Sequence, residues 1–145
     1  MEIHFHFEDV NPIIKNQQKV AEWLTESITA EHWELSGVNV IFCSDGFILD
    51  MNNKYLKHNY FTDIITFNYN QEKKLSGDLF ISTDRVKDNA QKGGVQFEEE
   101  LHRVLIHGLL HLCGYNDSTD EEQLEIRSKE DFYLNLRPLK IKRST

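Results

Sequence analysis

The chain contains little cysteine, proline or glycine and no long apolar run. Its 145 residues include two cysteines, Cys43 and Cys113, which are too few for a disulfide scaffold and favour a reducing compartment. Two prolines and seven glycines exclude collagen-like and low-complexity chains. No apolar run reaches the roughly 18 residues of a membrane span, and no basic segment opens the N-terminus. We therefore expect a cytoplasmic protein with no signal peptide and no membrane association.

Its composition is that of a globular domain. Hydrophobic residues make up 39% of the chain, enough at this length for a core without disulfides, and we predict a single domain over residues 1–145. The net charge of −8 argues against binding nucleic acid by neutralising it over the whole surface. A local basic groove is still compatible with that charge.

Apolar periodicity predicts strands mainly in the first half of the chain and helices in the second. Four segments are predicted strands: residues 3–7, 38–43, 63–69 and 75–82, the last interrupted at Gly77. Five are predicted helices: one opened by Pro12, then residues 45–56, 83–93 and 97–113, and one capped by Thr119 with Glu122. This order favours an α+β fold with a small mixed sheet of about four strands packed with helices.

The pattern richest in chemistry is VLIHGLLHLCGYND, residues 104–117. His107 and His111 are four residues apart on the predicted helix, so both imidazoles project from one face. Gly114 ends that helix and allows Asp117 to supply a third ligand, an arrangement typical of catalytic zinc. We predict one zinc per chain, held by His107, His111 and Asp117, with His107 also catalytic. The alternative is two partly buried histidines bonded to backbone carbonyls.

Several other residues are candidates for roles in or near this site. Gly108 stands where a zincin protease has the glutamate of H-E-x-x-H, which argues against a peptidase. Cys113 is interpreted as a small buried hydrophobe, and Asp78 as either a turn residue or an acceptor that orients a ligand histidine. His102 and Arg103 are predicted at the surface, with Arg103 within reach of substrate. No strong general base is evident.

The run HGLLHLCGYND resembles the H-G-x-L-H-L-x-G-Y-D-H signature of the YbeY family of metal-dependent endoribonucleases. The segments YLKHNYFTDIITFNY and LSGDLFISTDRVKDNA resemble two further segments of that family. The resemblance implies a zincin-like metal helix and a zinc-dependent endoribonuclease that cuts single-stranded RNA. Its role would be rRNA processing at the 3′ end of 16S rRNA and ribosome maturation, with rRNA precursors and ribosomal particles as partners and no nucleotide cofactor. The attacking group would be a metal-activated water or the RNA 2′-hydroxyl.

Two positions depart from the family pattern. Asn116-Asp117 replaces Asp-His, so the third ligand is a carboxylate, which zinc accepts. Leu56 replaces an arginine that the resemblance associates with RNA binding or cleavage. The second hypothesis is therefore a non-catalytic RNA-binding factor for ribosome assembly, stabilised by zinc. The sequence leaves the oligomeric state, the native metal and the RNA cleavage site open.

Overall fold

Strands and helices alternate along the first part of the chain, and three consecutive helices follow. The computed structural model describes residues 2–55 and 62–138. The elements in these ranges are β1 (Glu2–Phe7), α1 (Gln17–Ala30), β2 (Glu34–Cys43), α2 (Asp45–Tyr55), β3 (Ile64–Asn68), β4 (Lys74–Ser82), α3 (Thr83–Gly93), α4 (Phe97–Leu112) and α5 (Asp120–Asn135). None of these helices combines the length and apolar character needed to cross a membrane.

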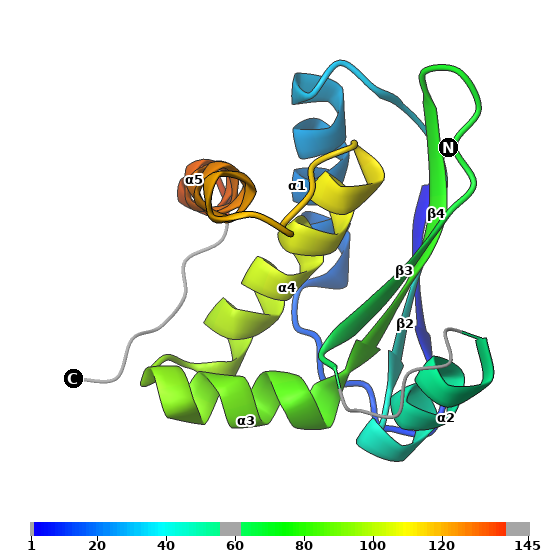
Figure 1. The fold of residues 1–145 in the computed structure, drawn as a ribbon, viewed down its shortest axis with the longest axis vertical. Coiled ribbons are helices and arrows are strands. Elements are labelled where there is room, and N and C mark those ends of the chain that lie inside the picture. The colour runs from blue at the N-terminus through cyan, green and yellow to red at the C-terminus, as the bar shows by residue number, and fades with distance from the viewer. Residues whose placement is uncertain (1, 56–61, 139–145) are drawn as a thin grey trace.

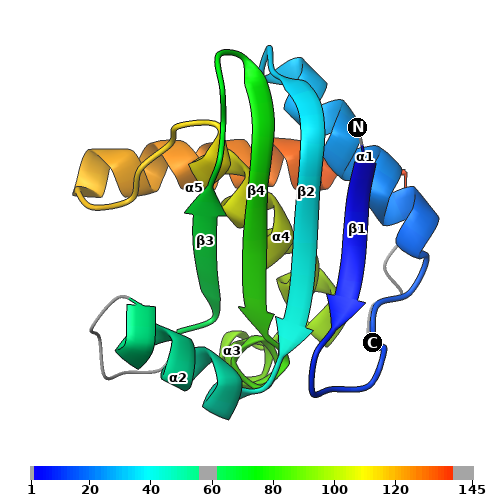
Figure 2. The ribbon, with the colours of Figure 1, turned by 90° about the vertical axis from the view of Figure 1, so that its right-hand side faces the viewer.

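The described strands form one mixed sheet in the order β1-β2-β4-β3. β1, β2 and β4 run parallel, and β3 pairs antiparallel with β4 (Figure 2). Helices α1 and α4 cover one face of the sheet, and α5 packs on α4 farther from the sheet (Figure 1). The main core lies between the sheet and these helices and includes Trp23, Phe42 and Leu105. The structure confirms the predicted α+β fold with a four-stranded mixed sheet.

Two glycines allow α4 to lie close to the sheet. A Cβ atom at Gly108 would stand 2.6 Å from Cδ1 of Ile64 on β3. A Cβ atom at Gly77 would stand 2.6 Å from the carbonyl oxygen of Phe67 and 2.9 Å from Cδ2 of Leu112, at the end of α4. Gly77 does not interrupt its strand, contrary to our prediction, because β4 continues through it with regular pairing on both sides.

The boundaries of two elements differ from those predicted. Helix α1 begins at Gln17 rather than near Pro12, and Asn16 before it takes a left-handed backbone conformation with φ of 57°. Ile14 lies in an irregular segment before the helix, and its side chain is buried. Its apolar character therefore reflects tertiary packing and not a helical stripe. Strand β2 begins at Glu34, ahead of the predicted start, because its first residues pair with β4 and Gly37 is accommodated at a bulge.

His102 lies in the core, so the prediction of a surface position is wrong. Its side chain is fully buried, and its Nδ1 atom accepts a hydrogen bond of 2.9 Å from Nη1 of Arg137. Its Nε2 atom has no hydrogen-bond partner within the described residues. Burial, together with the charge of Arg137, lowers the pKa of His102 to about 4. The residue that completes this environment is 35 positions away, so local periodicity gives no sign of it.

The buried His102 predicts a pH dependence of stability. Its pKa is about 4 in the folded protein and near 6.5 in the unfolded chain, which therefore binds more protons between these values. Stability rises with pH across this window and is lost as pH falls from 6.5 toward 4. Between about pH 7 and pH 5, the wild type should lose about 2 kcal/mol more free energy of unfolding than His102→Gln.

Urea titrations at the two pH values measure this difference. His4→Gln is the matched control, because it removes an exposed histidine of β1 by the same substitution. An identical pH dependence in the wild type and in His102→Gln would contradict the assignment of His102 as a neutral core residue.

Candidate metal centre

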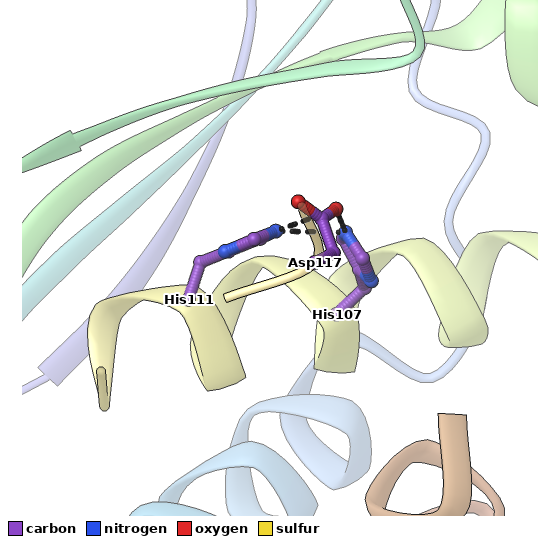
Figure 3. A group of neighbouring side chains, drawn as sticks. All are labelled: His107, His111 and Asp117. Atoms are coloured by element: carbon purple, nitrogen blue, oxygen red, sulfur yellow. Dashed lines mark hydrogen bonds and ion pairs between the residues drawn. The ribbon is translucent and has the colours of Figure 1, made fainter. Parts of the chain in front are cut away.

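The structure brings the three predicted ligands together. Figure 3 shows His107 and His111 projecting from one face of α4 toward the carboxylate of Asp117. The two Nε2 atoms are 3.0 Å apart. Oδ2 of Asp117 lies 3.2 Å from Nε2 of His111 and 3.4 Å from Nε2 of His107. All three side chains are partly exposed, so the cluster is reachable from solvent.

A tight turn at the end of α4 directs the chain back toward the histidines. Gly114 has φ of 105°, a left-handed conformation that favours glycine. Its N–H donates to the carbonyl of His111 at 3.0 Å, and the N–H of Tyr115 donates to the carbonyl of Leu110 at 3.0 Å. This is the Schellman pattern of helix termination, and it confirms Gly114 as the end signal.

Asp117 does not cap α5, which begins at Asp120. The N-cap is Thr119, whose Oγ1 accepts from the N–H of Glu122 at 3.1 Å while Oε1 of Glu122 accepts from the N–H of Thr119 at 3.0 Å. This confirms the predicted capping box. The Asp117 carbonyl accepts from Nε2 of Gln123 at 3.1 Å, which fixes the backbone there and leaves the carboxylate directed at the histidines.

Hydrogen bonds at the outer nitrogens set the tautomer of both histidines. Nδ1 of His111 lies 2.9 Å from the carbonyl oxygen of Tyr115, which can only accept, so Nδ1 carries the proton. Nδ1 of His107 lies 2.6 Å from Oε2 of Glu130 and donates to that carboxylate. In the neutral rings, each Nε2 therefore presents a lone pair to the other and to the Asp117 carboxylate. Three electron-rich atoms facing one point repel one another unless a proton or a metal cation lies between them.

The spacing of these donors fits a divalent metal. In a tetrahedral zinc site with bonds of about 2.0–2.1 Å, neighbouring ligand atoms are separated by about 3.3 Å. The three donor atoms here are separated by 3.0, 3.2 and 3.4 Å. The donor set of two imidazoles and one carboxylate suits zinc chemistry, and Glu130 supplies the carboxylate partner that metal-bound histidines commonly have. The cluster can therefore bind a metal ion, and the identity of its ligands stays a prediction.

Glu130 is a site residue that no motif in the sequence singles out. It lies on α5 with 3% of its surface exposed, and it accepts from His107 and, at 2.9 Å, from Nη1 of Arg103. Burial acts to raise the pKa of Glu130, but the hydrogen bonds and charges of His107 and Arg103 outweigh it and lower that pKa. One signal was available: Glu130 occupies a core position between Ile126 and Tyr133 in the helical stripe of α5.

His107 responds to the same contact. Burial acts to lower the pKa of His107, but the hydrogen bond and charge of Glu130, assisted by Asp117 and Asp63, raise it overall. Arg103 is held by Glu130 and by Oδ1 of Asp131 at 2.7 Å. Arg103 is not the free surface group that we predicted, because both ends of its guanidinium are engaged and the side chain is 20% exposed. It lines a cavity beside the cluster, and its contact with substrate stays a prediction.

Three other residues lie apart from the cluster. Asp78 is in the middle of β4 and accepts from Asn39 at 3.1 Å and from Tyr69 at 3.3 Å, so neither interpretation offered for it holds. Cys113 packs against the core, and burial raises its pKa to about 12, which confirms a small hydrophobe. Position 108 points into Ile64 and Leu79, so its side chain cannot supply the base of a zincin peptidase.

A cavity of about 670 Å³ adjoins the cluster. Its walls come from α4, α5 and the turn between them, with Asp63 just before β3, and they include His107 and Asp117. Burial raises the pKa of Asp63, and burial together with the charge of Asp63 raises the pKa of Glu100, which also lines the cavity. The departure at Leu56 lies outside the described residues.

A buried carboxylate secures the turn that holds His111. Glu31, at the end of α1, accepts hydrogen bonds from the hydroxyls of Tyr115, at 2.7 Å, and Tyr133. Nζ of Lys129 lies 3.5 Å from the same carboxylate. These bonds join α1, the turn after α4 and α5. Tyr115 is the residue whose carbonyl accepts from His111, so the side chain and backbone of one residue link Glu31 to the site.

Removing the Tyr115 hydroxyl should therefore destabilise the fold. We expect Tyr115→Phe to lower the free energy of unfolding by about 1–2 kcal/mol, because the Glu31 carboxylate, 11% exposed, loses a donor. Tyr69→Phe is the control, since its hydroxyl bonds to Asp78 at an exposed site and its loss should cost less than about 0.5 kcal/mol. Chemical denaturation measures both, and equal losses would refute the structural role of the Glu31 contact.

The fold is that of a single-domain α+β protein. Its candidate metal site consists of two histidines of a His-x-x-x-His helix and a carboxylate that follows the end of that helix. A family model described as Endoribonuclease YbeY matches residues 3–137. Endoribonuclease YbeY of Cytophaga hutchinsonii is 47% identical over 136 residues, covering 93% of this chain and 95% of that protein. The protein of the same name from Bacteroides thetaiotaomicron is 44% identical over 138 residues, covering 94% of this chain and 100% of that protein.

The solution structure of TM1509 from Thermotoga maritima superposes with a TM-score of 0.66 and 29% identity, covering 92% of this chain and 87% of that one. The chain therefore belongs to the endoribonuclease YbeY family. Membership confirms the resemblance noted in the sequence. It also confirms the expected class of enzyme, a nuclease that cleaves phosphodiester bonds.

Proposed function

We propose that this chain, as a single domain over residues 1–145, is a zinc-dependent endoribonuclease acting on single-stranded rRNA. Its substrates would be rRNA precursors in ribosomal particles, cut at the 3′ end of 16S rRNA in the cytoplasm. The observation that carries the proposal is the convergence of two imidazole lone pairs and a carboxylate beside a cavity. The family to which the chain belongs supports the choice of RNA.

In this proposal His107, His111 and Asp117 hold one zinc ion per chain. When bound, zinc polarises a phosphate oxygen and lowers the pKa of water. Glu130 and the Tyr115 carbonyl keep a proton on each Nδ1 atom, and this directs the Nε2 lone pairs inward. His107 belongs to the cluster and also lines the cavity, and in this proposal it serves as ligand and catalytic group.

Glu130 does not serve as the general base. One of its oxygens accepts from His107 and the other from Arg103, so it has no free position directed at substrate. The attacking group is either water or the 2′-hydroxyl of the RNA, and both fit a cavity that opens beside the cluster. Single-stranded RNA is favoured because its backbone can splay into a cavity between two helices, whereas a duplex presents a rigid surface.

One observation favours the second candidate, a zinc-stabilised RNA-binding factor without nuclease activity. Among the described residues that line the cavity, five are carboxylates: Asp63, Glu100, Asp117, Asp120 and Glu130. Such a wall repels phosphates and would weaken the binding of a scissile phosphate. Cleavage measurements separate the two candidates.

The ligand assignment predicts the effect of removing Asp117. We expect Asp117→Ala to lower zinc affinity by at least about 100-fold, because the site loses one of three protein donors. Asp117→His should retain zinc, since imidazole is an equally good ligand. Asp120→Ala, on the same cavity wall, removes the same charge and should change affinity little. Competition with a chromophoric chelator measures all three, and similar affinities for Asp117→Ala and Asp120→Ala would exclude Asp117 as a ligand.

The nuclease assignment predicts metal-dependent cleavage. Zinc-loaded wild type should cut a single-stranded fragment containing the 3′ region of 16S rRNA, and His107→Ala should abolish cleavage while its circular dichroism spectrum stays native. His4→Ala is the control, because His4 is exposed on β1 away from the cluster. If the wild type and His107→Ala cleave equally, the activity comes from a contaminant and the binding factor is the better assignment.

A further inference from the structure

The cavity beside the cluster has two arginines in its walls, and they differ in their contacts. Arg103 is bound to Glu130 and Asp131, as described above. Arg127 is exposed on α5 and forms no hydrogen bond or ion pair with the residues that the structure describes. Ion pairs engage the other arginines of the described ranges, Arg85 with Asp45 and Arg137 with Glu99. Arg127 is thus the arginine of these ranges whose guanidinium is free for a ligand.

Arg127 lies close to the cluster of His107, His111 and Asp117. It precedes Glu130 by three residues on α5, so the two side chains emerge about 5–6 Å apart on neighbouring turns of one face. The Glu130 carboxylate is 2.6 Å from His107. The charge of Arg127 also acts to lower the pKa of Glu100, which lines the α4 side of the same cavity. The positive charge of Arg127 is therefore felt on the opposite wall of the cavity, and no direct partner among the described residues neutralises it.

An exposed apolar side chain adjoins Arg127. Leu124, three residues earlier on α5, lines the same cavity and is 73% exposed. Sites for single-stranded nucleic acid combine cations for the backbone with side chains that pack against the bases, and these are most often aromatic. Leu124 and Arg127 offer both on adjacent turns, and we call these two residues the α5 edge.

We infer that the α5 edge binds single-stranded RNA next to the point of cleavage, with Arg127 contacting a phosphate and Leu124 packing against a base. This inference rests on the proposed function, because it assigns a binding role beside the same site. A guanidinium grips a phosphate through two parallel hydrogen bonds, which an ammonium cannot do.

The charge of the cavity makes this position selective. Five carboxylates line the wall, and the whole chain carries a net charge of −8, so most of this surface repels an RNA backbone. Phosphates are accepted where positive charge lies free, which within the cavity means Arg127 and, once zinc is bound, the cluster that would hold it. The spacing of these two points would then set which phosphate reaches the cluster.

Binding measured over a salt series tests the inference. The probe is a fluorescent, unstructured 2′-O-methyl oligoribonucleotide of about ten nucleotides, with zinc-loaded protein. Arg127→Gln should weaken binding about tenfold and reduce the slope of log affinity against log salt by about 0.7, the value for one phosphate contact on a single strand. Leu124→Ala should weaken binding by about fivefold, because it removes apolar contact area with a base. It should leave the slope of log affinity against log salt unchanged.

Lys19→Gln is the matched control. Lys19 is exposed on α1 and does not line the cavity, so its loss removes one positive charge and should leave affinity and slope close to wild type. Equal affinity and slope for Arg127→Gln and Lys19→Gln would overturn the inference. Zinc content is measured in each variant and should not change.

The inference and the proposed function fail separately. Arg127-dependent binding by a wild type that does not cleave RNA supports the α5 edge and rejects the nuclease. Cleavage by the wild type, with KM and binding unaffected in Arg127→Gln, supports the nuclease and rejects the α5 edge.

Discussion

The close contact between α4 and the sheet determines where the site lies. Gly108 faces β3 and β4 with no room for a side chain, and Leu112 packs where Gly77 leaves space. These contacts fix the rotation of α4 about its own axis, because a close-packed interior leaves little freedom to turn. With Gly108 held against the sheet, the adjacent His107 is directed toward α5 and the start of β3. A larger residue at either glycine would move the helix as a body, and both histidines with it.

The carboxylates around the site are paired with hydrogen-bond donors. Both oxygens of Glu130 accept a hydrogen bond, and the Glu31 carboxylate receives two hydroxyls. Buried carboxylates are costly unless they are bonded in this manner. The inner faces of His107, His111 and Asp117 are different, since their electron-rich atoms face one another. That contrast between a satisfied periphery and an unsatisfied centre is what makes the cluster suited to a cation.

Local features of the site could be predicted from sequence, and distant ones could not. The helical spacing of His107 and His111, the end signal at Gly114 and the capping box at Thr119 depend on residues within a few positions of one another. Glu130 bonds to a residue 23 positions away, Arg137 to one 35 away and Glu31 to one 84 away. Those pairs arise when helices dock, and helical periodicity can mark a buried position such as Glu130 but does not identify its partner. The predicted start of α1 was wrong for a related reason. Ile14 is buried by tertiary packing although it lies in an irregular segment before the helix.

The bond between His107 and Glu130 also sets the order in which the site is completed. A chain emerging from the ribosome exposes His107, His111 and Asp117 before Glu130, and a domain generally folds as a unit once its segments are available. Until α5 docks, Nδ1 of His107 lacks its acceptor and the imidazole is free to exchange between its two neutral tautomers. Only one of these presents the Nε2 lone pair to the cluster. The final geometry of the cluster is thus a late product of folding, and a nascent chain carries the three side chains before they converge.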